Sequence, residues 1–212
     1  MRRKWLISCG LISSLLYIAM NIFVPIGFKG YDSASQTVSE LSAIGAPTRA
    51  LWVALGTGYT LLMLGFGWGA LQSSSGDRKL KTTAALIFIY SAISLFWPLA
   101  PMHDRLTLAH GGRSATDEIH LILAMVTVVL MTLAIAYGAA SFGRRFRYYS
   151  YLTIIILLVF GALTGLDAPK VEANLPTPWV GVWERINIGV FLVWIMVLSL
   201  KLLFDKRRII PD

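Results

Sequence analysis

A chain of 212 residues in which 56% are hydrophobic and only 14% are charged does not fit a soluble domain, where about a quarter of the residues carry a charge. The net charge of +8 does not indicate nucleic-acid binding, because the basic residues lie at the ends of apolar runs rather than on one patterned helix. Cys9 is the single cysteine, which excludes an intrachain disulfide and any cysteine-based metal site.

Six apolar segments are long enough, or nearly so, to cross the roughly 30 Å of a bilayer's hydrocarbon core. Because lipid offers no hydrogen bonds to the backbone, each segment should be a helix rather than a strand. In chain order the predicted spans are residues 5–28, 51–71, 83–100, 119–141, 148–166 and 186–204. They occupy most of the chain, which predicts an all-α membrane protein: a bundle of six transmembrane helices that forms a single integral membrane domain over residues 1–212.

The charges alternate along the polar segments that flank these spans. Residues 2–4, 77–81, 144–147 and 201–212 hold 13 of the 19 Lys and Arg residues but only 3 of the 11 acids. The other three segments contain all three histidines and the remaining acids. Such alternation follows the positive-inside rule. For a bacterial host, it predicts a multi-pass protein of the cell (inner) membrane with both termini cytoplasmic, in contact with membrane lipids and with its histidines outside.

The first outer segment carries helix signals. Ser33 to Gln36 resembles a capping box, and Val38, Leu41 and Ile44 follow at helical spacing before Gly45. We therefore expect a short amphipathic helix over residues 33–44 that lies on the outer surface. In the second outer segment, residues 114–117 are expected to cap the fourth span.

The outer histidines suggest a metal site. Histidines and carboxylates are the usual protein ligands of zinc or another divalent metal when cysteine is absent. His103, His110 and His120 lie within 18 residues, and Asp117 is one helical turn before His120. We expect the three histidines to be metal ligands and Asp117 to be a ligand or an orienting group. Outer loops also carry such residues for solubility alone, and no spacing here matches a strong zinc signature.

The remaining outer polar residues complete a hypothetical lipid-hydrolase site. Glu40 or Glu184 would serve as general base for a metal-bound water, together with Asp117 as catalytic group. Ser39 and Arg185 would bind the substrate, with the guanidinium holding an anionic headgroup. Glu184 needs a partner near the membrane surface, and we expect it on another segment, because the neighbouring Arg185 points about 100° away on a helix.

Two other functions remain open. The protein could be a transporter of a small molecule or lipid, in which the same residues gate an outer vestibule, although the span interiors lack acidic and basic side chains. It could also be a non-enzymatic membrane partner protein whose outer loops dock another protein. A closed polar cavity beneath the outer loops would favour catalysis or ligand binding, and a flat outer surface would favour docking.

Several short motifs resemble one family. They are Tyr31, the run from Ser39 to Gly45, Phe96 to Pro98 leading to His103 and Asp104, Asp117 to His120, and Glu184 to Ile186. Together they look like the domain-of-unknown-function 998 family, a group of small polytopic membrane proteins from bacteria and archaea. The resemblance covers nearly the whole chain. It implies a six-helix bundle with these polar groups clustered externally, and it implies no established activity.

Overall fold

The computed structural model describes residues 2–74 and 76–205, and over these residues the chain is helical without a strand. Six helices are long and apolar enough to cross a membrane, which confirms the predicted all-α bundle. They are α1 (Arg2–Phe23), α2 (Arg49–Gln72), α3 (Arg78–Ser94), α5 (Ala115–Gly138), α6 (Arg144–Glu172) and α7 (Val180–Phe204). Four short elements connect them: η1 (Val24–Gly27), η2 (Val38–Ser42), η3 (Trp97–Leu99) and α4 (Arg105–Ala109).

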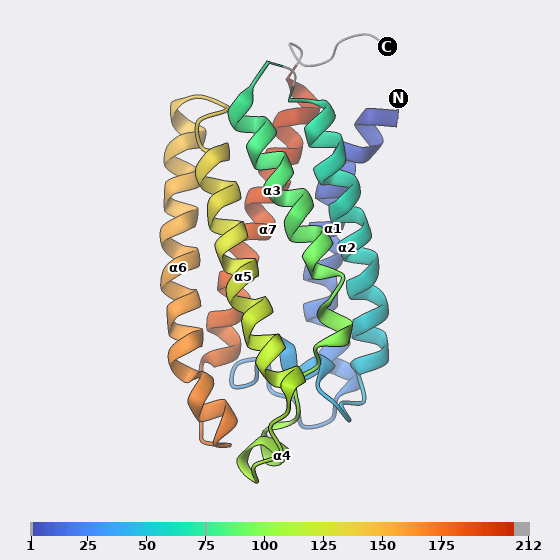
Figure 1. The fold of residues 1–212 in the computed structure, drawn as a ribbon, viewed down its shortest axis with the longest axis vertical. Helices are drawn as coiled ribbons and strands as arrows, with labels where there is room; N and C mark the ends of the chain where they lie inside the picture. The colour runs from blue at the N-terminus through green and yellow to red at the C-terminus, as the bar shows by residue number, and fades with distance from the viewer. Residues whose placement is uncertain (1, 75, 206–212) are drawn as a thin grey trace.

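The six long helices form a closed ring. Each packs against its neighbours in the order α1, α2, α3, α5, α6 and α7, and α7 packs back against α1. α1 begins and α7 ends at one end of the bundle, whereas α4 and the longer connections lie at the other (Figure 1). We call these the terminal end and the polar end. Phe66, Phe191 and Trp194 are fully buried in the core between them.

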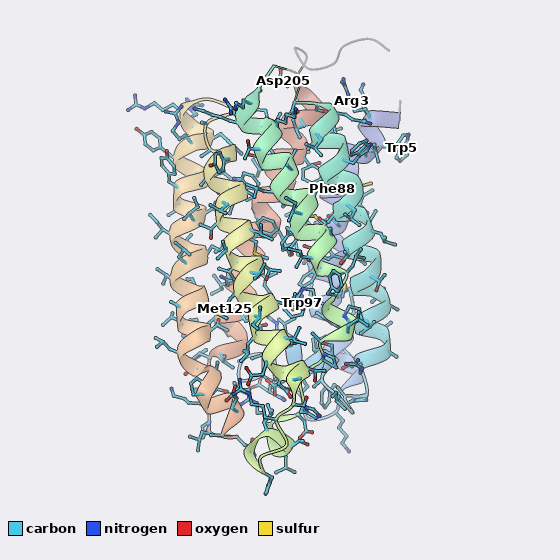
Figure 2. The ribbon with its side chains drawn as sticks, in the orientation of Figure 1. Arg3, Trp5, Phe88, Trp97, Met125 and Asp205 are labelled. Atoms are coloured by element: carbon cyan, nitrogen blue, oxygen red, sulfur yellow. The ribbon has the colours of Figure 1, made fainter. Side chains whose placement is uncertain are left out.

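The outer faces of the helices are apolar. Met125 on α5 is 63% exposed, and apolar side chains project from the bundle along its length (Figure 2). α6 is the least enclosed long helix, with only 11% of its most apolar stretch buried. Because a soluble protein rarely exposes so large an apolar surface, these faces indicate contact with membrane lipids.

The helices extend beyond the predicted spans at several ends. α6 begins four residues earlier and ends six residues later than the predicted span 148–166, because hydropathy ends at the first charges whereas the helix continues through them. Ser114 and Asp117 form the expected capping box of α5. In the third span, α3 ends at Ser94 and a separate turn, η3, carries the chain through Pro98.

The predicted amphipathic helix over residues 33–44 is wrong in extent and position. The Asp32 carboxylate accepts hydrogen bonds from the N–H groups of Ala34 and Ser35, which competes with helix formation there. Only η2 is helical, and Thr37 with Glu40 forms its capping box. Leu41 is fully buried, so η2 packs into the polar end instead of lying on the surface.

The orientation in the membrane stays a prediction, and Lys206, Arg207, Arg208 and Asp212 of the last basic segment lie outside the described residues. It can be tested in a Cys9→Ser background with one new cysteine at a time. A cysteine replacing the exposed His110 should react with a membrane-impermeant maleimide on intact spheroplasts. A cysteine replacing the exposed Lys79, at the terminal end, should react only after permeabilisation. The reverse pattern would contradict the assigned orientation.

Candidate functional site

The connection between η1 and α2, residues 28–48, folds back over the polar end of the bundle, where it contacts α7. Gly181 and Val182 donate backbone hydrogen bonds to the Ala34 carbonyl, at 2.9 and 3.4 Å. A Cβ at Gly181 would collide with the carbonyl oxygens of Ser33 and Gln36. The connection therefore lies directly on the backbone of the first turn of α7, which requires glycine there.

Arg185 fastens the same connection through its side chain. Its Nη1 donates to the Ser33 carbonyl at 2.8 Å, and its Nη2 donates to the Tyr31 hydroxyl at 2.7 Å. That hydroxyl in turn donates to the Thr37 carbonyl at 2.7 Å. Burial raises the pKa of Tyr31 to about 12, although Arg185 opposes this rise, so the phenol keeps its proton. The guanidinium that was expected to hold a headgroup is thus occupied by the protein's own loop.

Glu40 and Arg105 form a buried ion pair between η2 and α4. Arg105 Nε donates to Glu40 Oε1 at 2.7 Å and Nη2 donates to Oε2 at 2.9 Å, in a bidentate arrangement. The same arginine also donates to the Thr177 hydroxyl and the Ser35 carbonyl. The two side chains are only 5% and 13% exposed.

The carboxylate of Glu40 is fully occupied. It accepts further hydrogen bonds from Thr37, through both the backbone N–H and the hydroxyl, and from Gln36. Burial raises the pKa of Glu40, but the hydrogen bonds from Arg105 and Gln36 outweigh it and keep the pKa below its ordinary value. With five donors in place, this carboxylate supports the fold and leaves no oxygen free to activate water.

Asp117 has a similar structural task at the start of α5. Its Oδ1 accepts the His103 backbone N–H at 2.7 Å, and its Oδ2 accepts His103 Nδ1–H at 2.8 Å. Oδ2 also accepts the Ser114 backbone N–H at 2.9 Å, which completes the helix cap. Asp117 therefore joins the chain after η3 to the first turn of α5, through two hydrogen bonds that His103 donates.

Three further polar side chains come together near these hydrogen bonds: His120 from α5, Ser39 from η2 and Glu184 from α7. Ser39 Oγ lies 3.0 Å from His120 Nε2 and 3.4 Å from Glu184 Oε1. The other ring nitrogen, His120 Nδ1, donates to the Ala100 carbonyl at 2.8 Å. The second carboxylate oxygen of Glu184 accepts the Val38 N–H, so the expected partner of Glu184 on another segment is η2. We call Ser39, His120 and Glu184 the polar triad.

The polar triad faces a small cavity between α5, α6 and α7. Its volume is about 130 Å³, and its walls are mostly apolar. Leu121 and Ala124 line it on α5, and Thr164 and Ala168 line it on α6. Since Ala124 lies seven residues beyond Asp117, which also lines the cavity, the cavity extends about 10 Å along α5 from the polar end.

The three histidines do not converge as metal ligands. His110 is exposed at the end of α4 and donates from Nδ1 to the Leu106 carbonyl, whereas His103 and His120 point to different partners. Across residues 2–74 and 76–205, no group of three or more His, Cys, Asp or Glu side chains is placed to hold a metal ion. The geometry therefore gives the predicted metal set of His103, His110 and His120 no support.

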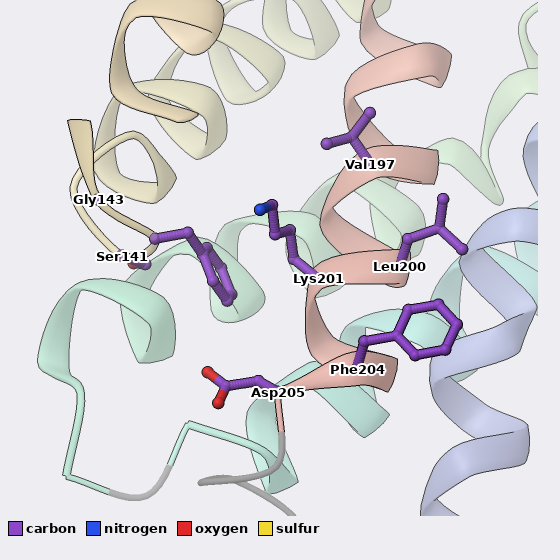
Figure 3. Close-up of a pocket in the computed structure, with 8 residues that line it drawn as sticks. Ser141, Gly143, Val197, Leu200, Lys201, Phe204 and Asp205 are labelled. Carbon is purple, nitrogen blue, oxygen red and sulfur yellow. The ribbon is translucent and has the colours of Figure 1, made fainter. Parts of the chain in front are cut away.

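A larger cavity of about 790 Å³ lies at the terminal end and holds none of the predicted site residues (Figure 3). Lys201 extends into it from α7, beside Phe204 and Asp205. Ser141 and Gly143 border it on the other side. It is separated from the polar triad by the buried middle of α7, including Phe191 and Trp194.

The residues that sequence reasoning missed are Arg105, Thr37 and Gly181. Arg105 looks like an ordinary loop residue in the sequence, and nothing local shows that it is buried. The one sequence feature that could have indicated it is Glu40, because a carboxylate that becomes buried needs a cationic partner. Which cation supplies it depends on the fold alone.

Replacing Arg105 with Gln should destabilise the protein by about 3 kcal/mol, because it leaves the buried Glu40 charge without its cation. The measurement is thermal unfolding in detergent at neutral pH. Since the pKa of Glu40 lies below its ordinary value of 4.5, the pair stabilises fully above pH 4.5 and loses this contribution as the pH falls through the lower folded-state value. The variant should therefore lose less stability than the wild type on acidification.

A matched control is Lys170→Gln, which removes the exposed ion pair with Asp167. Such a surface pair is worth roughly 0–1 kcal/mol, so the melting temperature should hardly change. Equal effects of the two substitutions would contradict a special role for the buried pair.

Comparisons with known proteins give one match, to a family model. No curated protein and no solved structure matches the chain. The model of the family described as "Protein of unknown function (DUF998)" matches residues 11–201, which is most of the chain and includes every residue of the polar triad. The chain therefore belongs to the DUF998 family.

Proposed function

We propose that this protein is a serine hydrolase of the membrane that cleaves an ester or amide bond in an amphiphilic substrate, with Ser39 as nucleophile and His120 as general base. The observation that carries the proposal is the contact of 3.0 Å between Ser39 Oγ and His120 Nε2 at the wall of a small cavity. A nucleophile and a base within hydrogen-bond reach, with the base oriented by a third group, is the arrangement that activates a serine.

The hydrogen bonds of His120 support its role as base. A carbonyl oxygen can only accept, so the contact with Ala100 places the proton of the neutral ring on Nδ1. Nε2 then carries the free lone pair and faces the Ser39 hydroxyl. The backbone of Ala100 thereby does what a carboxylate does in many serine hydrolases: it fixes the ring's orientation and tautomer. The Trp97 ring packs against the imidazole at 4.8 Å and holds its plane.

The reaction follows from these positions. Ser39 Oγ attacks the substrate carbonyl carbon while its proton passes to His120 Nε2. His120 then gives that proton to the leaving alcohol or amine, which leaves an acyl group on Ser39. A water molecule attacks the acyl carbon, its proton passes through His120 to Ser39, and the free acid departs. No oxidant, reductant or further reactant is needed.

The position of the cavity favours a membrane-embedded substrate. His120 lies five residues into α5, about 7 Å from its outer end, and the 24 residues of α5 span about 36 Å against a hydrocarbon core of roughly 30 Å. The polar triad then lies at about the level where polar headgroups join their chains. The apolar side chains of Leu121 and Ala124 continue the cavity deeper, where an alkyl chain fits.

This proposal changes the earlier hypothesis in one respect. A hydrolase remains the best-supported function, but the attacking group is the Ser39 hydroxyl instead of a metal-bound water, because the histidines do not share a site. Transport is less well supported. The two cavities lie at opposite ends, and the core of Phe191 and Trp194 lies between them.

The test is reaction of the purified protein with a fluorophosphonate, which modifies activated serines. The wild type should be labelled on Ser39, Ser39→Ala should not be labelled, and His120→Gln should react at least about a hundredfold more slowly. Ser42→Ala is the matched control: it lies in the same turn, and its hydroxyl bonds only to the Ser39 carbonyl. This variant should keep the wild-type rate.

Two results would count against the proposal. One is a folded wild-type protein that takes up no label. The other is a label on a serine other than Ser39, identified by mass spectrometry of the peptides.

A further inference from the structure

We infer that the amphiphile which this cavity accepts carries a cationic ammonium group next to the reacting bond, and that Glu184 selects it. This inference rests on the proposed function, because it names the substrate class of the same site. The inference follows from the acidic side chains that line the cavity and from which of them already have a hydrogen-bond or ion-pair partner.

The cavity has three acidic side chains and no Lys or Arg among its described lining residues. The titratable side chains that line it are Asp117, His120, Glu172 and Glu184. Two of the three acids already have partners. Asp117 is bonded by His103 and Ser114, and Glu172 pairs with Arg113 at 3.0 Å.

Glu184 differs from the other two acids. Its hydrogen-bond donor is the Val38 N–H. The Ser39 hydroxyl lies 3.4 Å from Oε1, but its single proton serves His120 Nε2 in the proposed arrangement. No Lys, Arg or His nitrogen in the described part of the chain forms an ion pair with Glu184. Both Nη atoms of the adjacent Arg185 donate hydrogen bonds elsewhere, to residues 31–36 and to the Gly181 carbonyl. Arg185 acts on Glu184 only through its field, without a direct ion pair. A carboxylate at an apolar wall with no cation bonded to it is costly, and a bound cationic ligand reduces that cost.

The same arrangement disfavours an anionic substrate. A phosphate bound beside Ser39 would face Glu184 with no Lys or Arg side chain among the described residues of the cavity wall to compensate its charge. Arg185, the residue that the sequence offered for an anionic headgroup, is held in the loop. An ammonium group at this position lies within reach of Glu184 Oε1, while the chain attached to it follows Leu121 and Ala124.

The experiment measures binding to the Ser39→Ala protein, which cannot turn over, in nanodiscs of phosphatidylcholine. The probes are dodecylamine, dodecanol and dodecyl phosphate, which share one chain and differ in the charge of the head. Empty nanodiscs correct for partitioning into lipid. Because a hydrogen bond between charged groups is stronger than one between neutral groups, the amine should bind at least about tenfold more tightly than either of the other two.

Two variants locate the preference. Glu184→Gln keeps an acceptor for the Val38 N–H and should abolish the preference for the amine. Glu172→Gln changes a second acid of the same cavity, one already paired with Arg113, and should leave the preference intact. The melting temperature of each variant shows whether it is folded.

The inference fails if the three probes bind equally, if none binds, if the phosphate binds best, or if Glu184→Gln keeps the preference for the amine. Its failure is distinguishable from that of the proposed function. Labelling of Ser39 without a preference for the amine overturns the inference alone. A preference for the amine without labelling overturns the hydrolase and leaves a binding site for cationic amphiphiles.

Discussion

The buried ion pair of Glu40 and Arg105 is the interaction on which the polar end depends. It joins η2 to α4 across 65 positions of sequence and holds both against the α6–α7 connection through Thr177. Without it, a charge would be left in a site where each side chain is almost wholly enclosed. Removing one partner of such a pair is costly because it leaves an uncompensated buried charge, and the docking of residues 28–48 on the bundle satisfies both charges. That docking presents Ser39 to His120.

In two pairs of adjacent residues, one side chain holds the fold together and the other faces the cavity. In the pair of Ser39 and Glu40, the acid fastens η2 while the hydroxyl faces the cavity. In the pair of Glu184 and Arg185, the guanidinium fastens the loop while the acid faces the cavity. Adjacent side chains point about 100° apart in an α-helix and about 120° apart in a 3-10 helix such as η2, so one can be enclosed by the protein while the next borders the site. The contacts of Glu40 and Arg185 therefore position their chain neighbours, Ser39 and Glu184, at the cavity.

The sequence predicted which residues gather at the candidate site, but it did not predict which of them contact one another. Ser39, Asp117, His120 and Glu184 all line the small cavity at the polar end, as their position between the predicted spans, or at the start of one, suggested. Their contacts, unlike their location, were not predictable. Ser39 was expected to bind substrate and instead contacts the histidine, whereas Glu40 and Arg185 are taken up by ion-pair and backbone contacts. Spacing along the chain cannot distinguish these outcomes, because each depends on a partner more than 60 residues away.

The sequence by itself determined the six helices and their approximate ends, because a bilayer requires about 20 apolar residues per crossing and leaves the backbone only a helix to form. It also determined that the polar residues gather at one end, since the spans alternate in direction. Only the tertiary structure decided which of those polar groups touch. Loop residues have no fixed periodicity, and a buried charge takes whichever partner the packing of distant segments supplies. The contact of Ser39 with His120 is a consequence of that packing, as is the cavity that both residues face.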